Sequence, residues 1–206
     1  MYALVEDGSI SKLITNPKSM VIGDVRYPAK IFQLWSKSEL NAIGIYEVVT
    51  NSTNFKDEKW YINTNESYAF ADNQVTRSWG TATPKAHADT LWTQADLDDG
   101  DLPSDKSVGD VKTEGLKTQL IRTLKSQVAG ILSNTDWYIT RNAEKEIAIP
   151  SAISTHRDAV RTKQASIETQ ITSASDTAAL ETLHTYTTDS DGVQSRPLGT
   201  LPTLEL

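Results

Sequence analysis

The chain contains 206 residues, 38% of them hydrophobic and 23% charged, which is typical of a globular protein with one or two domains. Its formal net charge of −7 argues against nucleic-acid binding, because the neutralisation of phosphates requires a clustered excess of lysine and arginine. The absence of cysteine excludes disulfides, and the three scattered histidines fit no zinc-binding pattern.

The first part of the chain, residues 1–82, has the composition of a small antiparallel β-rich domain. Residues 2–5 and 10–14 flank an Asp7-Gly8 turn and predict a β-hairpin. Four later segments rich in aromatic and β-branched residues predict strands, with asparagine and aspartate in the joins. An antiparallel meander is the expected arrangement of these strands, which cover residues 45–49, 59–63, 67–70 and 74–79.

One short helix is predicted to interrupt these strands, over residues 37–43. Ser36 and Glu39 have the spacing of a capping box, in which each side chain bonds the backbone of the other residue. Leu40 and Ile43 would face inward, and Gly44 would supply the left-handed stop.

Residues 83–114 are predicted to form a loop-rich acidic connector, because they contain prolines, glycines and a run of aspartates within residues 96–101. Leu91 and Trp92 are its main apolar anchor. The aspartate run does not fit an EF-hand loop, since Gly100 would stand at position five and no glutamate stands at position twelve. We expect a solvated acidic loop here, with calcium binding as the alternative.

A helical module is predicted over residues 115–186. Its first helix has one apolar face, made by residues that recur at steps of four, four, four and three: Leu116, Leu120, Leu124, Val128 and Ile131. At residues 134–136, short polar side chains can accept from free backbone N–H groups, so the helix either ends and Asp136 caps a new one, or it bends. Trp137 would close the corner.

A second helix is expected after Pro150, where Ile153, Val160 and Ile167 are spaced by seven residues. This spacing favours an antiparallel helical hairpin with the first helix, and a coiled coil is the alternative. Asp176 is predicted to cap a last short helix. Residues 187–206, which contain two prolines, are predicted to form an extended C-terminal arm that needs a neighbour. The fold class is therefore α+β.

Three stretches of the chain resemble bacteriophage tail proteins. The leucine-rich helix is followed by Thr135-Asp136-Trp137, and this succession resembles the C-terminal module of tail assembly chaperones and tail-fibre-associated proteins. The module continues with Arg141, Glu144, Ile149-Pro150, Arg157 and Arg161. The start of the chain, residues 1–5 with the later Tyr27-Pro28, and the stretch from Asp189 to Gly199 are also similar to phage tail proteins.

This resemblance implies a structural component of a phage tail: a fibre, fibre-anchoring or baseplate-associated subunit for virion assembly and host attachment. It implies other tail proteins as partners, a homo-oligomer that is a trimer in the usual fibre arrangement, and a host surface receptor as a further partner. The predicted interface residues are Trp137, Arg141, Ile153, Arg157, Val160, Arg161 and Ile167. The alternative is an assembly chaperone that is absent from the mature virion.

The expected location is the virion tail, after synthesis in the cytoplasm of the bacterial host. We expect no signal peptide, because residues 1–20 carry four charges and no long apolar core. We expect no membrane insertion, because no stretch approaches the ~20 apolar residues of a membrane span.

The sequence predicts no catalytic residues, no metal site and no cofactor, so we do not expect an enzyme. His156, Arg157 and Asp158 would diverge on a helix and are predicted to lie on a solvated face. Trp60 and Trp79 are candidates for stacking on a host glycan, although aromatic rings in such a β-domain more often belong to the core. Alternation along residues 60–62 predicts that at least one large ring faces outward.

Overall fold

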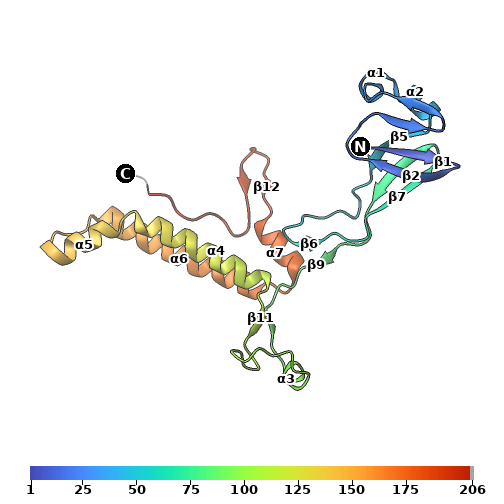
Figure 1. Cartoon of the computed structure of the whole chain (residues 1–206). Helices are drawn as coiled ribbons and strands as arrows, with labels where there is room; N and C mark the ends of the chain where they lie inside the picture. Colours follow the sequence, from blue (N-terminus) through green and yellow to red (C-terminus); the bar gives the residue numbers. More distant parts are fainter. Residues whose placement is uncertain (205–206) are drawn as a thin grey trace. The chain divides into compact units, whose positions relative to one another are not determined.

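The computed structural model describes residues 1–204 and shows an α+β protein (Figure 1). The chain forms two compact units, one of residues 1–83 and one that begins at Pro84. The first unit is built on a β-sheet with two short helices, and the second on a pair of long helices with smaller hairpins attached.

The sheet of the first unit has the strand order β2 (Ser9–Ile14), β1 (Tyr2–Glu6), β5 (Ile45–Thr50), β8 (Gln74–Ser78) and β7 (Ser67–Ala71). It curls, so that β2 and β7 at the two ends of this order contact one another. Contact between its outer strands shields hydrogen-bonding edges that would otherwise be open to other chains.

The predicted first hairpin is confirmed. β1 and β2 pair antiparallel, with Glu6 opposite Ser9. Asp7 and Gly8 both adopt positive φ angles, of 50° and 75°, as a two-residue turn between twisted strands requires.

The prediction of an antiparallel meander is wrong in two respects. β5 and β8 pair in parallel, with Val48 opposite Val75. The strand predicted at residues 59–63 is only β6 (Tyr61–Ile62), which lies outside this sheet. β7 and β8 form their own antiparallel hairpin, whose turn at Asp72 and Asn73 also has positive φ angles. Residues 51–66 connect β5 to this hairpin, and the second strand of the hairpin, β8, lies beside β5. Turn chemistry specifies a hairpin locally but does not specify which of its strands docks on a distant neighbour.

Two helices cover the core of the first unit: α1 (Ile31–Leu34) and α2 (Lys37–Ala42). The predicted capping box is confirmed, since the Ser36 amide donates to Glu39 Oε2 at 2.7 Å and the Glu39 amide donates to Ser36 Oγ at 3.3 Å. The Ser36 hydroxyl, which donates to Glu39 Oε2 at 2.7 Å, and the Ser36 amide lower the pKa of Glu39. The buried core contains Leu4, Ile14, Ile31, Leu40 and Ile45.

The predicted left-handed stop at Gly44 is confirmed by its φ of 82°. A Cβ at this position would lie 2.7 Å from the Val5 carbonyl oxygen, so only glycine fits here. A further hairpin of β3 (Met20–Ile22) and β4 (Val25–Tyr27), which the sequence did not predict, lies between β2 and α1.

The segment predicted as a loop-rich connector carries more regular structure than expected. β10 (Thr90–Leu91) and β11 (Val111–Thr113) pair antiparallel, and α3 (Gln94–Asp98) lies between them. Thr93 and Asp96 form a capping box at the start of α3. The short strands β6 (Tyr61–Ile62) and β9 (Thr83–Pro84) complete the elements before the long helices.

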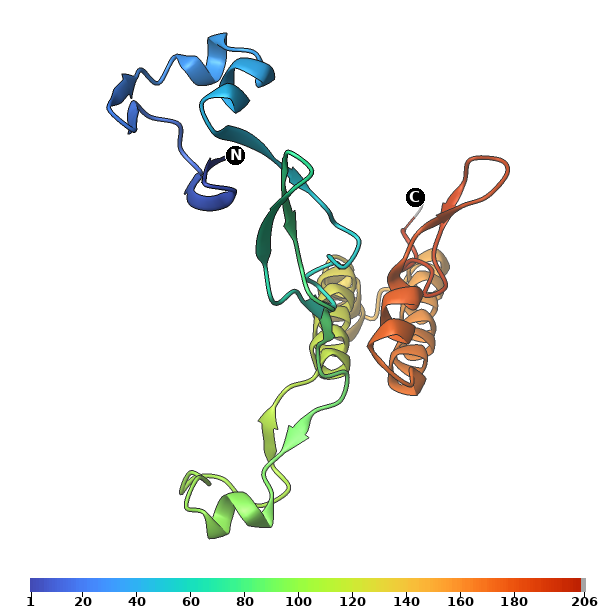
Figure 2. The same ribbon diagram turned by 90° about the vertical axis from the view of Figure 1, so that its right-hand side faces the viewer.

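The predicted helical hairpin is confirmed. α4 (Leu116–Ser133) and α6 (Ser151–Ser173) run antiparallel and pack side by side, joined through α5 (Asp136–Lys145) (Figures 1 and 2). Near one end, Lys117 Nζ donates to the Thr172 carbonyl at 2.7 Å. The buried side chains of the pair are Leu116, Leu124 and Val128 on α4, and Ile153, Val160, Ile167 and Ile171 on α6.

Asp176 caps α7 (Thr177–His184) as predicted, because its Oδ1 accepts from the Ala179 amide at 2.8 Å. The following arm is not simply extended. β12 (Thr187–Thr188) and β13 (Gln194–Ser195) pair around a turn held by the Asp189 carboxylate, which accepts from two backbone amides. Leu198 is then buried and its amide bonds the Leu183 carbonyl, so the arm folds back on its own chain. Its last two residues lie outside the described part.

We expect Ile153→Ala to destabilise the helical hairpin by about 2–5 kcal/mol, because Ile153 is only 1% exposed and its loss leaves a cavity. Urea unfolding followed by helical circular dichroism measures this change. Ile139→Ala is the matched control, since Ile139 is 41% exposed and its replacement should change stability by less than about 0.5 kcal/mol. Equal effects of the two variants would contradict the packing described.

Candidate functional site

The end of the helical hairpin presents an aromatic–arginine cluster of Trp137, Tyr138 and Arg141, all on α5. The two ring centroids lie 3.8 Å apart. The Arg141 guanidinium lies over both rings, 4.7 Å from the centroid of Trp137 and 5.5 Å from that of Tyr138. The four-residue spacing of Trp137 and Arg141 places them on the same face of the helix.

The aromatic–arginine cluster is partly open to solvent, since Tyr138 and Arg141 are half-buried and Trp137 is exposed. Trp137 is 51% exposed, although an indole ring gains free energy when it is buried. Arg141 has no acidic partner among the described residues, and its buried Nε has no hydrogen-bond acceptor there. Ile139 and Ile147, close by in the chain, are also exposed. The surface therefore combines uncovered apolar area with a guanidinium that has no acidic partner among the described residues.

Arg157 of α6 fixes the corner from which α5 starts. Its Nη1 donates to the Leu132 carbonyl at 2.8 Å and to Thr135 Oγ1 at 2.6 Å. The same nitrogen lies 2.9 Å from Asp136 Oδ1. One guanidinium thus adds a donor to a carbonyl at the end of α4, which also accepts from the Thr135 amide and hydroxyl, and pairs with the first residue of α5.

Two predictions about this corner are wrong. His156 and Arg157 do not lie on a solvated face, because each is only 8% exposed. Asp136 is not the N-cap, since Thr135 holds that position without a side-chain capping bond. The physical reason is that α6 packs across the corner and brings a guanidinium to the place where a capping bond would otherwise form.

The structure separates the seven predicted interface residues into two groups. Ile153, Val160, Ile167 and Arg157 are buried within the chain's own helical unit, so they offer no free surface. Trp137, Arg141 and Arg161 reach the surface, and Arg161 lies 3.4 Å from Asp158. Tyr138 belongs to the cluster but was not predicted, although its position beside Trp137 was a usable signal.

Trp60 is buried, with 3% of its surface exposed, so it cannot stack on a glycan. The predicted outward ring at residues 60–62 is wrong, because Tyr61 is buried too and Ile62 is the exposed residue. Trp60 lies in a turn, where its amide donates to the Asp57 carbonyl, and strand alternation starts only at Tyr61.

Trp79 is partly exposed and remains the candidate for glycan stacking. Its ring meets that of Phe55 at a centroid distance of 4.8 Å. The Arg77 guanidinium lies 4.4 Å from its centroid, so it takes up part of the ring surface that a sugar would use.

One carboxylate of the aspartate run at residues 96–101 is paired with other residues of the chain. Asp96 Oδ2 accepts from the Thr93 amide at 2.8 Å and from the Thr93 hydroxyl at 2.6 Å, and Lys112 pairs with the other carboxylate oxygen. The Lys112 ammonium and the Thr93 donors lower the pKa of Asp96 to about 2. Within residues 1–204, no three His, Asp or Glu side chains gather as metal ligands.

None of the helices in the described part of the chain combines the length and apolar composition that crossing a bilayer requires. Comparison of the chain with protein-family models, curated proteins and solved structures finds no match. The chemistry of the exposed surfaces therefore carries the functional argument together with the sequence resemblance.

We expect Arg157→Met to destabilise the helical unit by about 1–3 kcal/mol, because the buried Thr135 hydroxyl loses its donor and the Leu132 carbonyl loses one of its donors. Asp136→Asn should cost less than about 1 kcal/mol, since the Asp136 side chain is 59% exposed and its ion pair is screened. Chemical denaturation of both variants makes the comparison. A larger loss for Asp136→Asn would show that the ion pair, and not the carbonyl bond, fixes the corner.

We expect the carboxyl of Asp96 to titrate with a pKa of about 2, below its ordinary value of 3.8. Because the pKa is lowered in the folded state, Asp96 stabilises that state fully above its ordinary pKa and progressively less as the pH falls toward 2. Carbon NMR of the carboxyl group measures the pKa. Lys112→Met should raise it toward the ordinary value, and an unchanged pKa in that variant would contradict the role of Lys112.

Proposed function

We propose that the protein is a structural component of a bacteriophage tail, a fibre, fibre-anchoring or baseplate-associated subunit that acts through protein–protein interfaces. The exposed aromatic–arginine cluster is the observation that carries this proposal. Tryptophan, tyrosine and arginine are the residue types that most often dominate the binding energy of protein interfaces. Here all three stand together on one short helix.

The cluster also has the rigidity that an interface needs. Arg157 anchors the start of α5 to both long helices, so the rings are held in place before a partner arrives. Stacking of Arg141 on the two rings restricts its side chain in the same way. Such preorganisation reduces the entropy lost on binding.

The proposal includes other tail proteins as partners and the virion tail as the location. It includes a homo-oligomer, a trimer by analogy with fibres, with a role in virion assembly and host attachment. These elements rest on the resemblance around Thr135-Asp136-Trp137. Partner binding at the cluster would cover Trp137, whose exposure is otherwise unfavourable.

The second candidate is an assembly chaperone that binds an unassembled fibre protein and is absent from the virion. The same cluster favours it, because exposed rings on a helical hairpin can hold apolar surface of an incomplete partner. Glycan binding, as a third candidate, depends on Trp79. The presence or absence of the chain in finished particles separates the first two candidates.

The test is quantitative mass spectrometry of virions purified from the phage that encodes this chain. We expect the protein at a fixed copy number, and a Trp137→Ala, Arg141→Ala double variant should be incorporated at least about tenfold less, as the loss of two interface hot spots predicts. Lys125→Ala, at an exposed position on α4, is the control that should be incorporated normally.

Absence of the wild-type protein from virions, with recovery on unassembled fibre protein, would replace the structural role with the chaperone. Normal incorporation of the double variant would remove the cluster from the assembly interface. A Trp79→Ala variant that is incorporated normally but lowers adsorption would point to glycan binding.

A further inference from the structure

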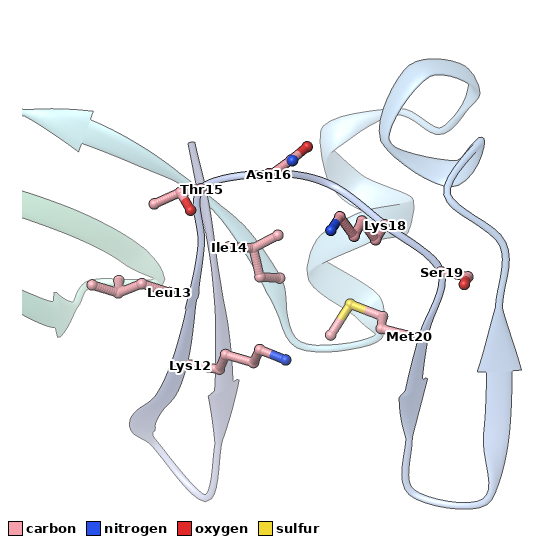
Figure 3. Close-up of a pocket in the computed structure, with 8 residues that line it drawn as sticks. All are labelled: Lys12, Leu13, Ile14, Thr15, Asn16, Lys18, Ser19 and Met20. Carbon is pink, nitrogen blue, oxygen red and sulfur yellow. The ribbon is translucent and has the colours of Figure 1, made fainter.

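A cavity of about 310 Å³ lies between the end of β2 and the start of β3 in the first unit (Figure 3). Lys12 and Lys18 extend into this hollow, whereas Leu13 points away from it (Figure 3). None of the residues that line the cavity is acidic: Lys12, Leu13, Ile14, Thr15, Asn16, Lys18, Ser19 and Met20. Two ammonium groups therefore face one space without a compensating carboxylate.

The cavity belongs to a basic segment, residues 9–38, in an otherwise acidic chain. This segment has five basic residues and one acidic residue, a net charge of +4, whereas the whole chain has −7. None of the five lies in an ion pair with another described residue: Lys12, Lys18, Arg26, Lys30 and Lys37. Aliphatic side chains on the same segment are uncovered, including Val21, Val25 and Leu34, the last of them 75% exposed.

The acidic segment, residues 93–110, has the complementary character. It contains six aspartates and one lysine, a net charge of −5. Asp99 and Asp101 are exposed and their carboxylates make no hydrogen bond or ion pair with other described residues. Leu97 and Val108 are exposed on the same segment. The capping box of α3 and the Asp96 pair with Lys112 hold this segment in a defined conformation.

We propose that the basic segment of one copy of the chain binds the acidic segment of a second copy. Carboxylates would enter the Lys12–Lys18 cavity, and the exposed aliphatic side chains of the two segments would cover one another. Two different surfaces meet in such a contact, so one copy keeps its acidic segment free and the other copy keeps its basic segment free. Repetition of a contact of this type produces a ring or an open filament.

A second copy fits the basic segment better than a small anion does. A free carboxylate or phosphate would neutralise the lysines but would leave Val21, Val25 and Leu34 exposed to water. An anionic membrane surface would also satisfy both features of the basic segment. The acidic segment is, however, present at the same concentration as the basic one, with matching charge and apolar side chains.

The test uses sedimentation velocity of the purified full-length chain over a concentration series. We expect self-association that weakens at high salt, because exposed ion pairs are screened. The double variant Lys12→Glu, Lys18→Glu and the double variant Asp99→Lys, Asp101→Lys should each associate at least about tenfold more weakly than the wild type. Lys125→Glu with Lys145→Glu is the control, which makes the same charge change at exposed sites elsewhere and should associate more strongly than the cavity variant.

Mixing the two double variants is the decisive step. Each variant alone brings like charges together, but the mixture pairs the unaltered basic segment of one with the unaltered acidic segment of the other. We expect the mixture to regain association close to that of the wild type, which also shows that both variants are folded. Failure of the mixture to associate would overturn the proposal.

Two other results would also overturn it: a wild-type chain that stays monomeric at all concentrations, or binding of the wild type to phosphatidylserine vesicles through Lys12 and Lys18 without self-association. The measurement needs only the purified chain. Its outcome is therefore independent of whether the protein is found in virions.

Discussion

The buried guanidinium of Arg157 is the constraint on which the shape of the helical unit depends. A chain that leaves α4 at Ser133 has carbonyl groups without intrahelical partners, and it must turn within two residues to begin α5. Arg157 meets this requirement from the facing helix, by bonding the Leu132 carbonyl and Thr135 and by pairing with Asp136. Arg157 thus joins the corner to the packing of the two long helices, because it belongs to one helix and bonds the end of the other.

This arrangement explains how a helix with no buried residues of its own can hold a defined position. α5 buries none of its side chains, so it cannot be held by a hydrophobic face. Its attachment is polar and lies at its first turn, which leaves Trp137 exposed and Tyr138 and Arg141 half-buried. A helix of this kind keeps apolar surface that its own core does not cover.

The distribution of charge adds a second organising feature. A net charge of −7 suggests a uniformly acidic surface, yet residues 9–38 are basic and residues 93–110 are strongly acidic. Like charges within each segment repel one another, so the clustering of charge does not stabilise the unit that carries the segment. The acidic segment offsets this cost in part through Lys112, which pairs with Asp96, whereas the lysines of the basic segment have no such partner among the described residues. Complementary charge on two surfaces favours contact between them and steers their encounter.

The sequence by itself determined the features that depend on neighbours in the chain: the Asp7-Gly8 turn, the Ser36–Glu39 capping box, the bounds of α4 and the pairing of the two long helices. Each of these follows from local geometry or from a repeat of apolar residues along one face. Only the tertiary structure decided the parallel pairing of β5 with β8, the burial of Trp60 and Tyr61, and the role of Arg157. The parallel pairing and the role of Arg157 bring together residues that are 22 to 27 positions apart in the chain. Trp60 lies in a turn, and the strand that follows it, β6, is too short to show alternation. A local sequence pattern does not specify which distant residues will pack against it, because the free energy that selects these contacts comes from the packing of the whole unit.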